Sequence, residues 1–128
     1  MGDPKKKILH VEDDKSVQLL VRAVLERAGY QVFTAVDAMQ GLMMVRQVQP
    51  DLVVLDVMMP AGGGGSVHER IRRLSGSSAT PILIYSATDP AEIAKKIPVD
   101  PLTLILQKPA PPAEIVAAVH KLFGAPAP

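Results

Sequence analysis

The sequence contains no cysteine and no tryptophan, and aromatic residues of any kind are scarce. The absence of cysteine excludes a disulfide framework and any metal site built from thiolates. With only 3% aromatic residues, a core must be packed from Val, Ile, Leu and Met. The longest apolar runs, such as Leu52–Leu55, are far too short to cross a bilayer. We therefore expect a cytoplasmic protein without a membrane anchor.

Excess charge of either sign is also lacking. The formal net charge of +1 provides no electrostatic field that would hold a nucleic acid, so we expect no direct nucleic-acid contact. Hydrophobic residues make up 48% of the 128 positions, which is enough to fill one core in a chain of single-domain size. We expect one domain with a core over residues 6–123 and flexible ends at 1–5 and 124–128.

Short apolar runs alternate with segments of helical period five times along the chain. This alternation predicts an α/β fold, doubly wound, in which helices cover both faces of a parallel sheet. The predicted strands are Lys7–Val11, Gln31–Ala35, Leu52–Leu55, Ile82–Ser86 and Leu102–Gln107. The predicted helices are Ser16–Ala28, a helix capped by Asp37 and ended by Pro50, a helix at about Ser66–Leu74, one opened by Asp89 and Pro90, and Ala113–Phe123.

The spacing of apolar residues also predicts which helix faces are buried. The apolar residues of the first helix are Val17, Leu20, Val21, Val24, Leu25 and Ala28. In the second helix they are Met39, Leu42, Met43, Val45 and Val48, and we interpret the methionines among them as core filling. Three arginines of the third helix, Arg70, Arg72 and Arg73, are interpreted as a solvated face.

Polar groups follow four of the five predicted strands. They are Glu12 with Asp13 and Asp14, then Asp56, Ser86 and Lys108. Each alone could be a helix cap, a strand end or a turn residue. Ligands of such sheets bind at the carboxyl ends of the strands, and carboxylates gathered there repel one another unless a cation offsets them. Carboxylates without a neighbouring His or Cys suit Mg²⁺, and a carboxylate can itself attack phosphorus.

Four segments together resemble the receiver domains of two-component response regulators. They are ILHVEDD at Ile8–Asp14, PDLVVLDVMMP at Pro50–Pro60, PILIYSA at Pro81–Ala87, and the pair Lys108-Pro109. The resemblance runs in register from about Lys6 to Phe123. It implies a flavodoxin-like (βα)5 sandwich whose five-stranded parallel sheet has the order 2-1-3-4-5.

The resemblance also implies roles for individual residues. Asp56 matches the phospho-acceptor, and Asp13 and Glu12 match the acidic pair that holds Mg²⁺, or Mn²⁺ as a substitute. Met58 would offer its backbone carbonyl to the metal. Lys108 would pair with the phosphoryl oxygens, and Ser86 would hydrogen-bond to one of them. The partners implied are a histidine kinase or phosphotransfer protein and a downstream protein.

Two features depart from the family pattern. Ile105 stands where such domains often have an aromatic residue that moves with the hydroxyl residue, so an aromatic readout is excluded. The stretch Ala61–Gly65 is rich in glycine, which predicts a flexible loop beside the site. Prolines before and after the fifth strand are expected to stiffen the face that relays the signal; they are Pro98, Pro101, Pro111 and Pro112.

Two other functions remain open at this stage. A degenerate receiver would keep the fold as a protein–protein module without phosphorylation. A metal-dependent phosphatase with an aspartyl nucleophile would need an acidic residue two positions after it, and Met58 stands there, so we expect no turnover of an external substrate. No pair among His10, His68 and His120 has metal-ligand spacing, and we interpret all three as structural.

Overall fold

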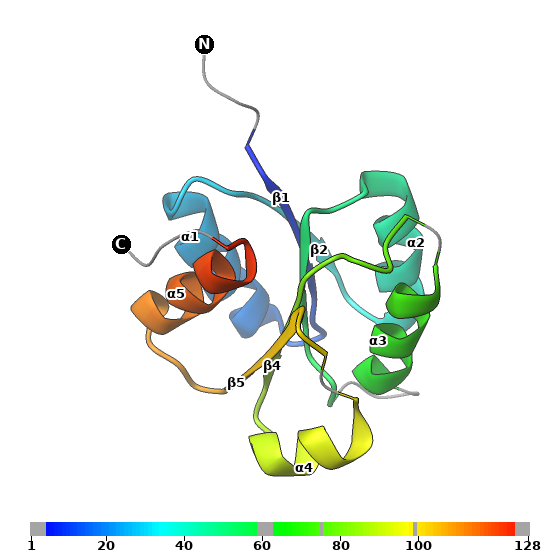
Figure 1. Cartoon of the computed structure of the whole chain (residues 1–128). Coiled ribbons are helices and arrows are strands. Elements are labelled where there is room, and N and C mark those ends of the chain that lie inside the picture. Colours follow the sequence, from blue (N-terminus) through cyan, green and yellow to red (C-terminus); the bar gives the residue numbers. More distant parts are fainter. Residues whose placement is uncertain (1–4, 59–62, 75, 99, 125–128) are drawn as a thin grey trace.

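The computed structural model of the chain describes residues 5–58, 63–74, 76–98 and 100–124, with side chains left undescribed at 63–66. Five parallel strands form one sheet in the order β2-β1-β3-β4-β5, as the sequence predicts (Figure 1). The strands are β1 Lys7–Val11, β2 Gln31–Ala35, β3 Leu52–Leu55, β4 Ile82–Ser86 and β5 Thr103–Gln107. Of the expected flexible ends at 1–5 and 124–128, residues 1–4 and 125–128 lie outside the described residues.

Five helices alternate with the strands and cover both faces of the sheet. They are α1 Lys15–Arg27, α2 Ala38–Val48, α3 Gly63–Arg73, α4 Pro90–Lys96 and α5 Pro112–Leu122. In Figure 1, α1 and α5 lie on one side of the sheet, and α2 and α3 lie on the other. Ile93 of α4 and Ile97, the residue after it, pack into the core on the α2/α3 side. This arrangement places the loop after each strand at one common edge of the sheet.

Alternation along the strands divides the core into two apolar layers. In β3, Leu52 and Val54 face α1 and α5, whereas Val53 and Leu55 face α2, α3 and α4. All four side chains are fully buried, which explains why this strand is apolar at every position. The two layers hold β1 and β3 firmly at the centre of the sheet, and both strands deliver acidic residues to its carboxyl edge.

Short polar side chains begin three of the helices. Asp14 accepts hydrogen bonds from the amides of Ser16 and Val17 at the start of α1. Asp37 accepts one from the amide of Gln40, and Asp89 accepts one from the amide of Ala91. The end of α1 is followed by Gly29, whose φ of 98° lies in the left-handed region that favours glycine.

The predicted buried faces of α1 and α2 are partly wrong. Met39 and Met43 are 80% and 52% exposed, so the interpretation of both as core filling fails. The reason lies at Gly41, where a Cβ atom would sit 3.0 Å from both γ-carbons of Val11. This close approach turns Gly41 towards β1 and rotates residues two positions away to the outer side. Two expected core residues of α1 are likewise exposed, Leu20 and Ala28.

The third helix also differs from expectation. It begins at Gly63, so three glycines of the expected loop belong to its first turn; Ala61 and Gly62 lie outside the described residues. Among its arginines, Arg72 is not a solvated residue, because its Nε lies 2.7 Å from Asp100. Arg72 also donates to the carbonyls of Thr80 and Leu102, at 2.6 Å and 3.4 Å. It therefore ties α3 to the segments that precede β4 and β5.

This arginine makes the contribution of Asp100 to stability depend on pH. The hydrogen bond from Arg72 lowers the pKa of Asp100 from 3.8 to about 2. A lowered carboxyl pKa means that the stabilisation is complete above about pH 4 and is lost as the pH falls towards 2. We expect Asp100→Asn to reduce the free energy of unfolding at pH 7 by roughly 1–3 kcal/mol.

The measurement is urea unfolding of both proteins at pH 7, 4 and 2.5. The difference in free energy of unfolding between the parent and Asp100→Asn should become smaller between pH 4 and pH 2.5. Glu69→Gln is the matched control, because Glu69 pairs with Arg73 at the exposed surface and the change should cost less than about 1 kcal/mol. A deficit of Asp100→Asn that stays constant with pH would contradict this account.

Candidate functional site

Three carboxylates converge at the carboxyl edge of the two central strands. Glu12 and Asp13 follow β1, and Asp56 follows β3, which is the neighbour of β1 in the sheet. One carboxylate oxygen from each lies within 4.8 Å of the others. Glu12 and Asp56 are buried, and Asp13 is exposed. The structure thus brings together the three carboxylates that the sequence indicated as metal ligands.

A single ammonium group joins the buried carboxylates. Lys108 follows β5, and its Nζ lies 2.6 Å from Oε1 of Glu12 and 3.3 Å from Oδ2 of Asp56. The same Nζ lies 5.7 Å from the ring centroid of Tyr85, so the aromatic face adds a weaker attraction. The Lys108–Pro109 peptide bond is cis. One lysine thus offsets two negative charges that stand on different strands.

Burial and charge act in opposite directions on these groups. Burial raises the pKa of Glu12 above its usual value, although hydrogen bonds from Lys108 and the Asp14 amide partly oppose it. Burial lowers the pKa of Lys108, but the hydrogen bond to Glu12 and the charge of Asp56 outweigh it and raise the pKa. Lys108 is therefore a firmly held cation at neutral pH.

Backbone groups and a glutamine fix the carboxylates in place. The amide of Met58 donates to Oδ1 of Asp56 at 2.9 Å, and the amide of Asp14 donates to Oε2 of Glu12 at 3.1 Å. The side chain of Gln18, one turn into α1, donates to the carbonyl of Glu12 at 2.6 Å. The loops after β1 and β3 are thereby held against their own acidic side chains.

Two predicted site residues stand apart from this cluster. Ser86 is buried at the end of β4, and its hydroxyl lies 3.4 Å from the hydroxyl of Thr88 and 3.3 Å from the Thr88 amide. No hydrogen bond links Ser86 to the carboxylates in the described part of the chain. The side chain of Met58 is 64% exposed, so only its backbone engages Asp56. Ile105 packs against the core layer that contains Ile93 of α4 and Ile97, the residue after this helix.

Three further residues contribute to the site without having been predicted from the sequence. Gln18 lies one helical turn after the cap residue Asp14, and this spacing only weakly indicates a contact with the site. Tyr85 shares the α1/α5 face with Leu83 by strand alternation, but its contact with Lys108 depends on the turn after β5. His10 is fully buried, and its Nε2 lies 3.9 Å from Oε1 of Glu12. Burial, followed by the charge of Lys108, lowers the pKa of His10 to about 3.

The donor set fits a hard divalent cation. Three carboxylates supply only oxygen ligands, which is the preference of Mg²⁺, and Mn²⁺ accepts the same donors. The exposed position of Asp13 leaves one side of the cluster accessible to solvent. One lysine cannot neutralise three carboxylates, so a divalent ion would complete the balance of charge.

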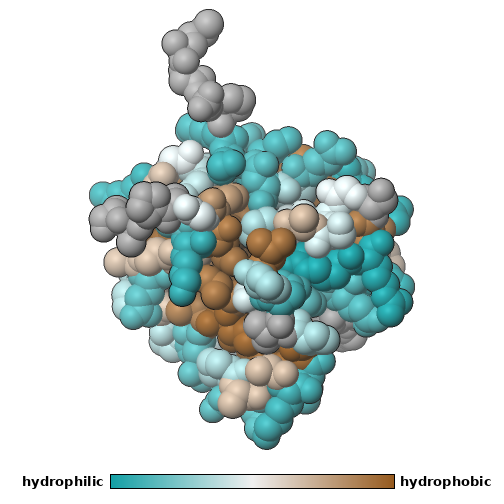
Figure 2. All heavy atoms as spheres, viewed as in Figure 1, coloured by the Kyte–Doolittle hydropathy of each residue, from teal (hydrophilic) through white to brown (hydrophobic). Residues whose placement is uncertain are grey.

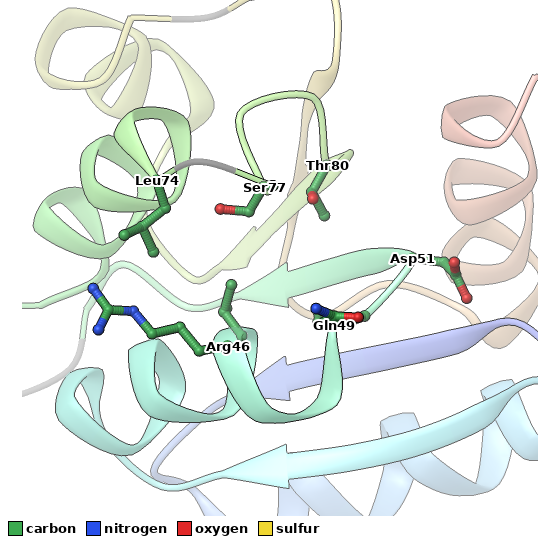
Figure 3. Close-up of a pocket in the computed structure, with 9 residues that line it drawn as sticks. Arg46, Gln49, Asp51, Leu74, Ser77 and Thr80 are labelled. Carbon is green, nitrogen blue, oxygen red and sulfur yellow. The ribbon is translucent and has the colours of Figure 1, made fainter.

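Two hollows of the surface lie away from the carboxylates. The first has a volume of about 670 Å³ and is lined by Arg46, Asp51 and Ser77 among others. Figure 3 shows it between the ends of α2 and α3. Gln49 and Asp51, which line it, come just before β3, so the hollow lies at the edge of the sheet opposite the carboxylates. Two of its polar groups already have partners, since Ser77 donates to the carbonyl of Ile71 and Asp51 accepts from the Lys7 amide. The second, of about 530 Å³, lies beside His68, Arg72 and Lys96.

Comparisons with known proteins agree with this geometry. The family model of the response regulator receiver domain matches residues 8–120. The chain is 41% identical over 81 residues to the DNA-binding dual master transcriptional regulator RpaA of Synechocystis, covering 63% of this chain and 34% of RpaA. It is 35% identical over 121 residues to the probable transcriptional regulator ycf27 of Cyanophora paradoxa, covering 93% and 48%. The chain thus spans about a third to a half of these relatives.

Solved structures show the same architecture. Chemotaxis protein CheY4 of Vibrio cholerae superimposes with a TM-score of 0.87 at 28% identity, over 93% of this chain and 99% of that one. The receiver domain of the sensor histidine kinase PA1611 of Pseudomonas aeruginosa, described with a magnesium ion coordinated in its active-site cleft, gives 0.85 at 24% identity, over 95% and 100%.

The chain belongs to the response regulator receiver domain family of two-component systems, whose general function is that of a phosphorylation switch. Within the described residues, no helix has both the length and the apolar character required to cross a membrane.

The central lysine should control the ionisation of Glu12. In Lys108→Met the carboxyl of Glu12 loses its closest hydrogen-bond donor, so burial acts with less opposition and its pKa should rise further. The measurement is a carbon-13 NMR titration of the Glu12 carboxyl in both proteins. Lys95→Met is the control, because Lys95 pairs with Glu92, an exposed residue of its own helix, away from the acidic cluster. An unchanged Glu12 pKa in Lys108→Met would show that the lysine is not its main counter-charge.

Proposed function

We propose that this chain is a phosphorylatable receiver in which Asp56 takes a phosphoryl group from the phosphohistidine of a histidine kinase or phosphotransfer protein. The observation that carries the proposal is the Lys108 ammonium, which contacts both Asp56 and Glu12. A degenerate receiver would not need a partly buried cation shared by two carboxylates. We further propose that residues 6–123 act as one receiver domain and that it works in the cytoplasm.

The chain's own residues would perform distinct parts of the transfer. A carboxylate oxygen of Asp56 attacks phosphorus, the bond from phosphorus to the donor's nitrogen breaks, and an acyl phosphate remains on Asp56. The Met58 amide, which donates to Oδ1 of Asp56, holds the carboxylate in one orientation. Lys108 stands close enough to pair with a phosphoryl oxygen, and Ser86 would reach another after its hydroxyl leaves Thr88.

Glu12, Asp13 and Asp56, with the Met58 carbonyl, would hold the magnesium ion. When bound, the ion supplies positive charge next to the phosphoryl oxygens and so reduces repulsion from the carboxylates. Mn²⁺ is proposed as a substitute because it takes the same oxygen ligands.

The phosphorylated state would be relayed through the surface formed by β5, α4 and α5. In Figure 2 hydrophobic atoms gather in the middle of this face, and Leu104, Ile105 and Leu106 of β5 are only half-buried. β5 is an edge strand of the sheet, which leaves its outer side free for a protein partner. Ile105 of β5, which packs against the core layer that contains Ile93 of α4, would transmit movement of this face in place of an aromatic ring. We propose a protein partner and no direct nucleic-acid contact.

Phosphorylation of Asp56 is the direct test. The protein is incubated with acetyl phosphate and Mg²⁺, and intact mass spectrometry should show the gain of one phosphoryl group. Asp56→Asn, of nearly equal shape, should show none. Asp51→Asn is the matched control, because Asp51 is an exposed aspartate at the opposite edge of the sheet and should leave the gain unchanged. Replacing Mg²⁺ by Mn²⁺ should support the reaction, and chelation should abolish it.

Absence of any mass gain under these conditions would reject the proposal and leave a protein–protein module as the function. A gain in the Asp56→Asn variant equal to that of the parent would place the acceptor elsewhere. Steady release of phosphate from small phosphate esters would instead favour the phosphatase.

Residue 58 should govern how long the acyl phosphate persists. Met58 adjoins Asp56 through its backbone, and its exposed side chain offers no hydrogen bond to an attacking water. Met58→Asn should therefore shorten the phosphorylated lifetime several-fold, since an amide can orient that water. Decay is followed by mass spectrometry after removal of the donor. Met39→Asn, a change at an exposed methionine of α2, should decay like the parent. Equal decay in all three proteins would remove this role from residue 58.

A further inference from the structure

His10 occupies an unusual place for a polar residue. It lies in β1 at the centre of the sheet, opposite Thr34 of β2 and Val54 of β3, and its side chain is fully buried. Neither ring nitrogen has a hydrogen-bond partner in the part of the chain that the structure describes. Unpaired polar atoms at such depth reduce stability, and an aliphatic side chain would pack there without that cost.

The polar neighbour of this imidazole is the acidic cluster. Nε2 of His10 lies 3.9 Å from Oε1 of Glu12. That same oxygen accepts the 2.6 Å hydrogen bond from Lys108, while Oε2 accepts from the Asp14 amide. Glu12 therefore depends on Lys108 for one oxygen, and His10 stands unused beside it.

We propose that His10 is a positioning residue that donates its Nε2–H to Glu12 when Lys108 turns towards a phosphoryl group on Asp56. The inference rests on the proposed function. Apart from the magnesium ion proposed above, Glu12 would then keep only the Asp14 amide as a donor, and the loss of the ammonium at Oε1 would oppose the movement of the lysine. An exchange of donors on Oε1 removes that opposition. It requires Nε2 and Oε1 to approach by only about 1 Å to reach hydrogen-bond distance.

Nitrogen-15 NMR of the His10 ring tests the exchange in the intact protein. Beryllofluoride with Mg²⁺ serves as the phosphoryl mimic. Its addition should place the proton of the His10 ring on Nε2 and move the Nε2–H resonance towards that of a strong hydrogen bond. A protein that binds beryllofluoride at Asp56 while the His10 ring signals stay unchanged would overturn the inference but leave the proposed function standing. Failure to bind beryllofluoride or to accept a phosphoryl group would overturn both.

Two substitutions separate positioning from packing. His10→Leu removes the donor and keeps the volume, whereas His10→Gln keeps an N–H at about the position of Nε2. We expect His10→Leu to be phosphorylated by acetyl phosphate about tenfold more slowly than the parent, since one hydrogen bond to a charged group is lost. Its unfolding midpoint in urea at pH 7 should be equal or higher. His10→Gln should recover most of the rate.

If His10 were purely structural, the opposite pattern would be seen. His10→Leu would then be phosphorylated at the parent rate, or its slower phosphorylation would be accompanied by a matching loss of stability. Equal slowing in the Leu and Gln variants would likewise overturn the inference, because it would show that shape rather than the donated hydrogen matters.

Discussion

The electrostatic balance around Lys108 is the constraint on which the acidic site depends. Two buried carboxylates on neighbouring strands would repel each other, and desolvation would favour their neutral forms. Lys108 offsets this by contacting both Glu12 and Asp56, at 2.6 Å and 3.3 Å. Because the lysine comes from the loop after β5, the balance requires strands at both the centre and the edge of the sheet to end at the same level.

The sheet order meets that requirement. β1 and β3 are adjacent and carry the carboxylates, while β4 stands between β3 and β5. The amide of Lys108 donates to the carbonyl of Ser86 at 2.8 Å, so the lysine loop is fastened to the end of β4. The Lys108 side chain then passes the ring of Tyr85 to reach the acidic cluster. The chemistry of the site is thus inseparable from the packing of the α1/α5 layer that holds Tyr85.

Much of the fold and the site could be predicted from the sequence because both follow from short-range patterns. Apolar runs such as Leu52–Leu55 mark the buried strands, and the polar residue after each strand marks the binding edge. What could not be predicted depends on contacts between distant segments. Arg72 is half-buried against Asp100, a residue 28 positions further along the chain. The orientation of α2, which exposes Met39 and Met43, depends on the close approach of Gly41 to Val11.

The network around Thr103 has a consequence for the proton of a second buried histidine. The Thr103 hydroxyl has one hydrogen, and it is given to Asp100 at 2.9 Å. Oγ1 also lies 3.2 Å from Nη2 of Arg72, which can only donate, and 3.0 Å from Nε2 of His68. With its single hydrogen committed, the hydroxyl is an acceptor towards both, so His68 must carry its proton on Nε2. The single hydroxyl hydrogen of Thr103 therefore selects the tautomer of His68 on α3.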